Sequence, residues 1–137
     1  MERSLRIGQS VIDAIATHAR DDAPLECCGL LIGAGDHVVQ ASRAINLDRS
    51  PRRYTLDPRT YLQVSREART QGLDVVGAYH SHPKSPPIPS ETDLAEGADA
   101  PFVYLIAGPV VADEPIAIRA WQKTGRAFTE ILLRIEA

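Results

Sequence analysis

Four prolines lie among the seven residues that follow His82, and they constrain the fold more than any other feature of the sequence. Proline fixes φ and has no N–H to donate, so residues 83–89 cannot belong to a regular helix or to the interior of a sheet. The largely apolar residues 73–79 predict a central strand, and residues 90–99 predict a short helix. His80 and His82 are therefore expected at the end of a buried strand, next to a stiff connection.

The rest of the chain alternates between helical and strand patterns. Apolar residues recur at helical spacing over residues 8–20, and Asp57-Pro58 with a later Gly72 predicts a helix over residues 58–71. Short apolar runs predict strands over residues 27–32, 38–45, 54–56, 102–107, 115–122 and 127–134. Neither a linker nor a repeat divides the chain, so we expect a single domain over residues 1–137. The order predicts an α+β fold, an α/β sandwich in which a mixed β-sheet is flanked by helices.

The composition excludes several classes of partner. The chain is 44% hydrophobic and 24% charged, and its net charge of −3 gives no electrostatic footprint for a nucleic acid. No apolar run approaches the roughly 20 residues that span a bilayer, so we expect no membrane association. The first ten residues lack the apolar core of a signal peptide, which predicts a cytoplasmic protein. The sequence leaves the oligomeric state open.

His80, His82 and Asp93 form the pattern that carries chemistry. Side chains in a strand alternate between faces, so His80 and His82 point the same way, with Cα atoms roughly 6.5 Å apart. Two imidazoles at this separation can converge on one ion at Zn–N distances of about 2.0–2.1 Å. Asp93 is the natural third ligand, because the stiff connection can return the chain to the strand end. The sequence therefore predicts one zinc ion per chain, with a fourth position open for water.

Hydrolysis by such a centre also needs a base and an oxyanion donor. Ser90 suits the donor role because it shares a helix face with Asp93, although serine and an acid at this spacing also fit a helix cap. Glu26 would be held by rigid backbone at the start of a predicted strand. Spacing alone leaves four candidates for the base, namely Glu26, Glu67, Glu91 and Glu96.

The spacing H-x-H-x7-S-x2-D, from His80 to Asp93, resembles the JAMM signature of the JAB/MPN metalloprotease family. Residues 24–31 (PLECCGLL) and Pro83 resemble the small bacterial members, and the resemblance covers residues 8–122. It implies a zinc peptidase that cuts amide or isopeptide bonds after the C-terminal glycine of ubiquitin-like proteins. It also implies that Glu26 is the general acid/base, that Ser90 stabilises the oxyanion, and that the fold is similar to that of cytidine deaminase.

The resemblance also indicates a substrate class. Eight residues separate Asp93 from Phe102, which leaves little room for the insertions that hold two ubiquitins in eukaryotic relatives. The small bacterial relatives act on sulfur-carrier proteins of ubiquitin-like fold and release an amino acid such as cysteine. We therefore expect the C-terminal tail of such a carrier as the partner, with Arg53, Tyr54 and Ser81 as contacts.

Four alternatives remain open at this point. A non-catalytic scaffold of the same fold would bind without cutting, and a zinc hydrolase could act on a small-molecule amide. A zinc deaminase would need H-x-E and a later P-C-x-x-C, whereas this chain has His80-Ser81-His82. A cysteine hydrolase would use Cys27 or Cys28 as nucleophile, but both lie in a predicted buried strand, where we expect free core thiols.

Overall fold

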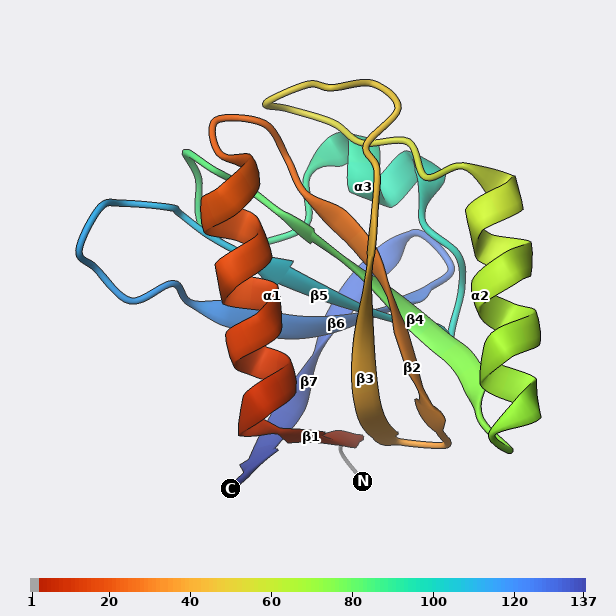
Figure 1. The fold of residues 1–137 in the computed structure, drawn as a ribbon. Coiled ribbons are helices and arrows are strands. Elements are labelled where there is room, and N and C mark those ends of the chain that lie inside the picture. Colours follow the sequence, from red (N-terminus) through yellow and green to blue (C-terminus); the bar gives the residue numbers. More distant parts are fainter. Residues whose placement is uncertain (1–2) are drawn as a thin grey trace.

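The computed structural model describes residues 3–137 as seven strands and three helices (Figure 1). The strands are β1 (Ser4–Gly8), β2 (Cys28–Ala34), β3 (His37–Ala44), β4 (Asp74–Ser81), β5 (Val103–Ala107), β6 (Ile118–Thr124) and β7 (Ala127–Glu136). The helices are α1 (Gln9–Asp22), α2 (Pro58–Thr70) and α3 (Glu91–Glu96). No helix of this part of the chain is long and apolar enough to cross a membrane.

The strands form one mixed sheet in the order β1-β3-β2-β4-β5-β6-β7, and the pairing of β1 with β7 closes it. β1 runs parallel to β3 and β7, and β4 runs parallel to β5, whereas the other neighbours are antiparallel. The predicted mixed sheet with flanking helices is confirmed. Its closure was not predicted, because no strand was expected before the first helix.

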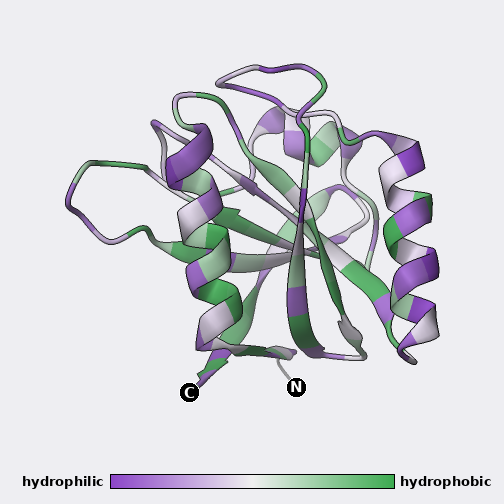
Figure 2. Cartoon of the chain, in the orientation of Figure 1, coloured by the Kyte–Doolittle hydropathy of each residue, from purple (hydrophilic) through white to green (hydrophobic). Residues whose placement is uncertain are grey.

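Two apolar clusters pack on opposite faces of the sheet. α1 contributes Ile15 and Ala19 to one cluster, and α2 contributes Val64 and Ala68 to the other. In β5 the side chains alternate between the clusters, so that Leu105 faces α1 and its neighbours face α2. Figure 1 places the two helices on either side of the strands, and Figure 2 shows hydrophilic residues along the outer side of α2.

Three predicted elements differ in detail from the structure. Residues 54–56 form no strand and contribute only an isolated bridge between Leu56 and Asn46. α3 is shorter than predicted, because Gly97 ends it. β6 begins at Ile118 and not at residue 115, which is a proline that cannot donate to the ladder.

Candidate metal centre

The end of β4 and the start of α3 bring together His80, His82 and Asp93. Their ligand atoms all lie within 4.8 Å of one another. Nε2 of His80 lies 3.2 Å from Oδ2 of Asp93, and Nε2 of His82 lies 3.3 Å from the same oxygen. Both imidazoles are buried, and the Asp93 side chain is only 11% exposed. Two imidazoles and a carboxylate therefore face one small volume, which is the ligand set of many catalytic metal sites.

The backbone of His80 is fixed by strands on both sides of β4. His80 pairs with Cys28 of β2 and with Ile106 of β5. Its ring stacks on Tyr54, with ring centroids 4.6 Å apart and planes 26° from parallel. Nδ1 of His80 is buried without a hydrogen-bond partner among residues 3–137. Sheet pairing and stacking therefore orient this ring, and Nε2 is the nitrogen that faces Asp93.

His82 is oriented by the proline-rich connection. Its Nδ1 donates to the carbonyl oxygen of Pro86 at 2.9 Å, because a carbonyl can only accept. Nε2 is then the nitrogen that faces Asp93 and that is available to a metal ion. Nε1 of Trp121 donates to the carbonyl oxygen of Pro87 at 3.0 Å and anchors the connection to β6. A Cβ at Gly108 would lie 2.3 Å from the carbonyl oxygen of His82, so this close approach requires glycine.

Ser90 caps α3 and thereby positions Asp93. The Ser90 hydroxyl accepts from the backbone N–H of Asp93 at 3.1 Å, and Asp93 Oδ2 accepts from the backbone N–H of Ser90 at 2.8 Å. These reciprocal bonds form a capping box, which confirms the cap interpretation of this pair. The hydroxyl proton of Ser90 is not used by the cap, so the side chain can still donate a hydrogen bond.

The surroundings of the three ligands shift their pKa values so that Asp93 is a carboxylate and His80 a neutral imidazole. Burial raises the pKa of Asp93, but hydrogen bonds from His80 and His82 outweigh it and hold that pKa well below its usual range. Burial lowers the pKa of His80 and keeps its ring neutral. Burial also acts to lower the pKa of His82, but its bonds to Asp93 and to the carbonyl oxygen of Pro86 raise that pKa overall. Asp93 is thus ionised at neutral pH.

Glu26 lies just before β2, on the same side of the sheet as His82. The antiparallel register sets Cys28 opposite His80, and continuing it by two residues sets Glu26 opposite His82. Its backbone N–H donates to the carbonyl oxygen of Ser50, and its own carbonyl oxygen accepts from Nδ2 of Asn46. Burial raises the pKa of Glu26 to about 8, against a smaller lowering by His82. Glu26 is therefore the buried carboxyl group beside the histidines.

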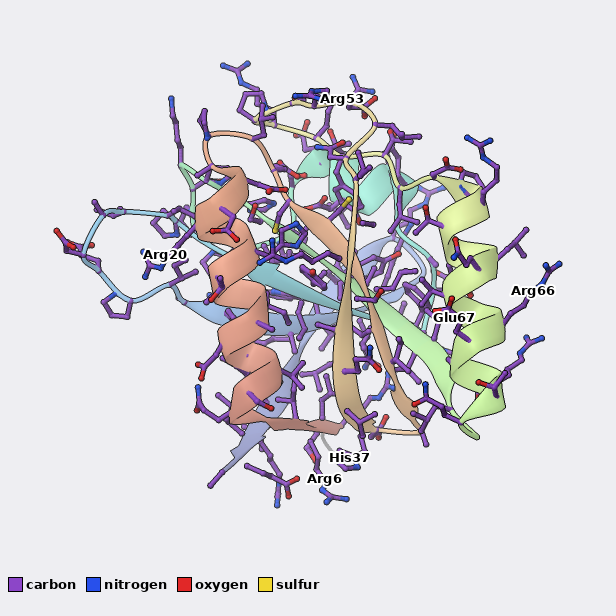
Figure 3. All side chains as sticks on the ribbon, in the orientation of Figure 1. Arg6, Arg20, His37, Arg53, Arg66 and Glu67 are labelled. Carbon is purple, nitrogen blue, oxygen red and sulfur yellow. The ribbon has the colours of Figure 1, made fainter. Side chains whose placement is uncertain are left out.

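The other three candidate bases lie in different surroundings. Glu91 and Glu96 are exposed on α3. Glu67 is exposed on α2, where Figure 3 labels it. Exposure leaves their carboxylates in water and outside the cavity that His82 and Lys84 line, although Glu96 lines a cavity that also reaches His80. The geometry therefore favours Glu26 among the four, a choice that spacing alone did not make.

Two cavities reach the three ligands, each through different ligand residues. The Tyr54 cavity, of about 320 Å³, includes His80, Asp93, Arg53, Tyr54 and Phe128 in its lining. The Lys84 cavity, of about 380 Å³, is lined by Glu26, His82, Ser90, Arg52, Lys84, Ser85 and Pro51. His80 and Asp93 thus face the first cavity, whereas His82 faces the second together with both predicted catalytic residues.

Comparison with known families agrees with this geometry. Residues 8–123 match the family described as prokaryotic homologs of the JAB domain. The chain belongs to this JAB family. The family resemblance inferred from the spacing of His80, His82, Ser90 and Asp93 is therefore confirmed.

Two relatives of this chain are named as a desampylase and as a peptidase. This chain is 36% identical to a desampylase of Haloferax volcanii, over 96% of each chain. It is 33% identical to the CysO-cysteine peptidase of Mycobacterium tuberculosis, over 83% of this chain and 90% of that protein. The predicted enzyme class, a JAMM-type peptidase, is thereby confirmed.

A comparison with a solved structure bears on the fold and not on the function. A JAB1/MPN domain protein from Archaeoglobus fulgidus superposes with a TM-score of 0.64 at 20% identity, over 97% of this chain and 98% of that one. The JAB/MPN fold expected from the sequence thus agrees with a solved neighbour.

The predicted substrate contacts do not all lie at the surface of the site. Tyr54 and Arg53 both line the Tyr54 cavity. Nε of Arg53, which Figure 3 labels, also lies 3.6 Å from Oδ2 of Asp48 in the same loop. Ser81 is fully buried, because strand alternation turns it to the face opposite His80 and His82. Its hydroxyl accepts from the backbone N–H of Cys27 at 2.8 Å. The expectation that Ser81 contacts substrate is therefore corrected: Ser81 holds β2 against β4.

The two cysteines are buried and free, as expected. Burial raises the pKa of Cys27 and of Cys28 to about 12, so neither supplies a thiolate nucleophile at neutral pH. The cysteine-hydrolase alternative therefore has no structural support.

Asn46 is a residue of the site that the sequence does not predict. Its Nδ2 donates to the carbonyl oxygens of Glu26 and Arg53, and its Oδ1 accepts from the backbone N–H of Thr55. Asn46 is buried and ties the Glu26 backbone to the Tyr54 segment. In the sequence it only begins a polar loop, and no local pattern separates it from the solvated residues that follow.

Proposed function

We propose that this chain binds one zinc ion through His80, His82 and Asp93 and hydrolyses the amide or isopeptide bond after the C-terminal glycine of a ubiquitin-like or sulfur-carrier protein. One observation carries the proposal: two buried imidazoles and a carboxylate converge, and the buried Glu26 lies beside them in the cavity that His82 lines. The proposal treats residues 1–137 as one catalytic domain that acts in the cytoplasm.

The three side chains fit zinc by their chemistry. Two imidazole nitrogens and a carboxylate oxygen are ligands that zinc takes in catalytic sites. The bond from His82 Nδ1 to the Pro86 carbonyl oxygen fixes the tautomer that leaves Nε2 free, as is usual for metal-binding histidines. Coordination through Nε2 of His80 would likewise fix its proton on Nδ1. A bound zinc ion would make hydroxide available near neutral pH and polarise the scissile carbonyl group.

Glu26 and Ser90 supply the remaining chemistry in this proposal. The carboxylate of Glu26 takes the proton of the attacking water and then delivers it to the leaving nitrogen. One carboxyl group can serve both steps, because it accepts the proton as a carboxylate and returns it as an acid. The Ser90 hydroxyl donates to the substrate carbonyl oxygen as negative charge develops on it.

The names of the relatives and the Tyr54 cavity support a carrier tail as substrate. The relatives include a desampylase and a CysO-cysteine peptidase, whose names denote release of a conjugated protein or of an amino acid. The Tyr54 cavity reaches His80 and Asp93 from the side of the Arg53–Leu56 segment. An extended glycine-ended tail in this cavity would place its carbonyl carbon beside the three ligands.

Mass measurement of the carrier C-terminus tests the proposal. The zinc-loaded chain is mixed with a panel of ubiquitin-like sulfur carriers, each joined through its terminal glycine to one amino acid or to a lysine side chain. We expect the mass of at least one carrier to fall by that of the attached group, and a zinc chelator to prevent the change. If every adduct stays intact while the chain holds zinc, the proposed activity is refuted.

The role of Glu26 has its own control within this assay. Glu26→Gln keeps the size of the side chain and removes the proton acceptor, so we expect it to bind zinc and to lose nearly all hydrolysis. Wild-type rates in Glu26→Gln would exclude Glu26 as the base and leave the rest of the proposal in place.

A further inference from the structure

The catalytic groups are distributed unequally between the two cavities beside the ligands. Glu26 and Ser90 line the Lys84 cavity, and neither lines the Tyr54 cavity. A third cavity also reaches Glu26, from the side of α1, but none of the three ligands lines it. Of these three cavities, only the Lys84 cavity is lined by both Glu26 and a metal ligand.

This distribution distinguishes the two sides of the scissile bond, if the proposed function holds. Hydrolysis breaks the C–N bond: water adds its oxygen to the acyl carbon, and its proton passes through Glu26 to the nitrogen. The group that delivers this proton must lie within hydrogen-bond reach of the leaving nitrogen. The leaving group therefore occupies the Lys84 cavity, next to Glu26, and the acyl part of the carrier occupies the Tyr54 cavity.

The Lys84 cavity has two cationic side chains at its outer wall. Arg52 and Lys84 both line it, and the only carboxyl group in its lining is Glu26. Neither cation forms an ion pair with any residue from 3 to 137. In the Tyr54 cavity, by contrast, Asp93 and Glu96 accompany a single arginine, Arg53, which already has Asp48 as a partner.

One hydrogen bond restrains the backbone at or next to each of these two cations. The carbonyl oxygen of Pro83 accepts from the backbone N–H of Val110 at 2.9 Å, next to Lys84. The backbone N–H of Arg52 donates to the hydroxyl of Ser50 at 3.1 Å. The two cations therefore start from restrained backbone, while their long side chains can move to meet an anion.

We infer that Lys84 and Arg52 bind the α-carboxylate of the leaving group, so that the chain releases a free α-amino acid from the glycine end of its carrier. In such a substrate the carboxylate carbon is two bonds from the leaving nitrogen, so nitrogen at Glu26 places the carboxylate within the same cavity. A lysine joined through its side chain carries no charge so close to the nitrogen, and within a protein its own carboxyl group is an amide. Free cations beside the general acid therefore favour the amino acid over the lysine linkage.

Three substrates that differ only in the leaving group test this inference. One ubiquitin-like carrier ending in Gly-Gly is extended by alanine with a free carboxylate, by alanine carboxamide, or by an isopeptide-linked Nα-acetyl-lysine amide. The zinc-loaded wild-type chain should cleave the free carboxylate with a kcat/KM about tenfold or more above the other two. That ratio corresponds to one charge-assisted hydrogen bond.

Variants assign the preference to the two cations. Lys84→Ala and Arg52→Ala should each raise KM for the carboxylate substrate about tenfold with little change in kcat, because the contact exists before and during the reaction. Their kcat/KM for the carboxamide should fall much less, so that the preference for the carboxylate shrinks toward one. Arg66→Ala is the matched control, since Arg66 points outward from α2 (Figure 3) and should change neither substrate.

The possible results separate this inference from the proposed function. If the wild-type chain cleaves carboxylate and carboxamide equally well, the carboxylate assignment is wrong and the proposed function stands. A preference that persists in both Lys84→Ala and Arg52→Ala also overturns the assignment. If none of the three substrates is cleaved by the zinc-loaded chain, the proposed activity on such carriers fails, and the assignment falls with it.

Discussion

Glu26 illustrates at the scale of one residue how the fold and the proposed chemistry compete. Glu26 is 4% exposed, and burial raises its pKa to about 8. A carboxyl group in this position is protonated over a pH range in which it would ionise freely in the unfolded chain. The fold therefore gains stability from protonated Glu26 at low pH and loses that contribution as the pH rises through about 8.

This linkage predicts that Glu26→Gln stabilises the metal-free protein in a pH-dependent way. The amide has no charged form, so the free energy of unfolding should rise by about 1–3 kcal/mol relative to wild type at pH 8. The gain should shrink toward pH 4, where the carboxyl group is protonated in both the folded and the unfolded state. Urea unfolding in the presence of a chelator at several pH values measures it, and a gain independent of pH would contradict the account.

At the scale of elements, the site depends on the very short helix α3. α3 has six residues and none of them is buried, so packing does little to hold it. Its capping box supplies the order that packing does not, and the same two residues form that box and place Asp93 at the ligand cluster. The helix start and the third ligand are thus one structural feature.

Ser90→Ala should therefore weaken zinc binding as well as catalysis. Loss of an N-cap side chain costs about 0.5–2 kcal/mol of helix stability, and loss of groups that orient a ligand typically weakens metal binding by about 10–100-fold. Ser90→Thr keeps the oxygen that caps α3 and should bind zinc within a few-fold of wild type. Competition with a chelating indicator measures both affinities, and unchanged affinity in Ser90→Ala would refute the coupling.

The sequence predicted those parts of the site that follow from local geometry. Strand alternation placed His80 and His82 on one face, and a single helical turn related Ser90 to Asp93. The position of Glu26 depends instead on β2 lying antiparallel to β4, which sets Glu26 opposite His82. Residue spacing carries no information on sheet order, so only the family resemblance identified Glu26. The buried face of Ser81 did follow from alternation, and the predicted substrate contact conflicted with it.

At the scale of the whole molecule, β1 joins the two ends of the sheet. It pairs with β3 on one side and with β7 on the other. Leu5 and Ile7 are fully buried in the apolar cluster to which α1 contributes Ile15 and Ala19. The sequence pattern does not predict this strand, because only two apolar residues alternate before a strong helical pattern begins. A strand this short is recognisable only from its partners, which lie at the far end of the chain and in β3.

Closure of the sheet predicts a large effect from one small change in β1. Leu5→Ala should lower the free energy of unfolding by about 2–5 kcal/mol, the range for truncating a buried leucine. Arg6→Ala is the matched control, since its ion pair with Glu136 is exposed at the surface and contributes about 1 kcal/mol or less. Urea unfolding of both variants tests this, and equal effects would contradict a structural role for β1.

The most direct test of the metal centre is the number of zinc ions bound per folded chain, measured by native mass spectrometry. The account predicts one zinc ion in the wild-type chain and one in Glu26→Gln, because Glu26 lies beside the ligands and is not one of them. It predicts none in His80→Ala or Asp93→Ala. Zinc retained in Asp93→Ala, or lost from folded Glu26→Gln, would contradict the assignment of ligands and base.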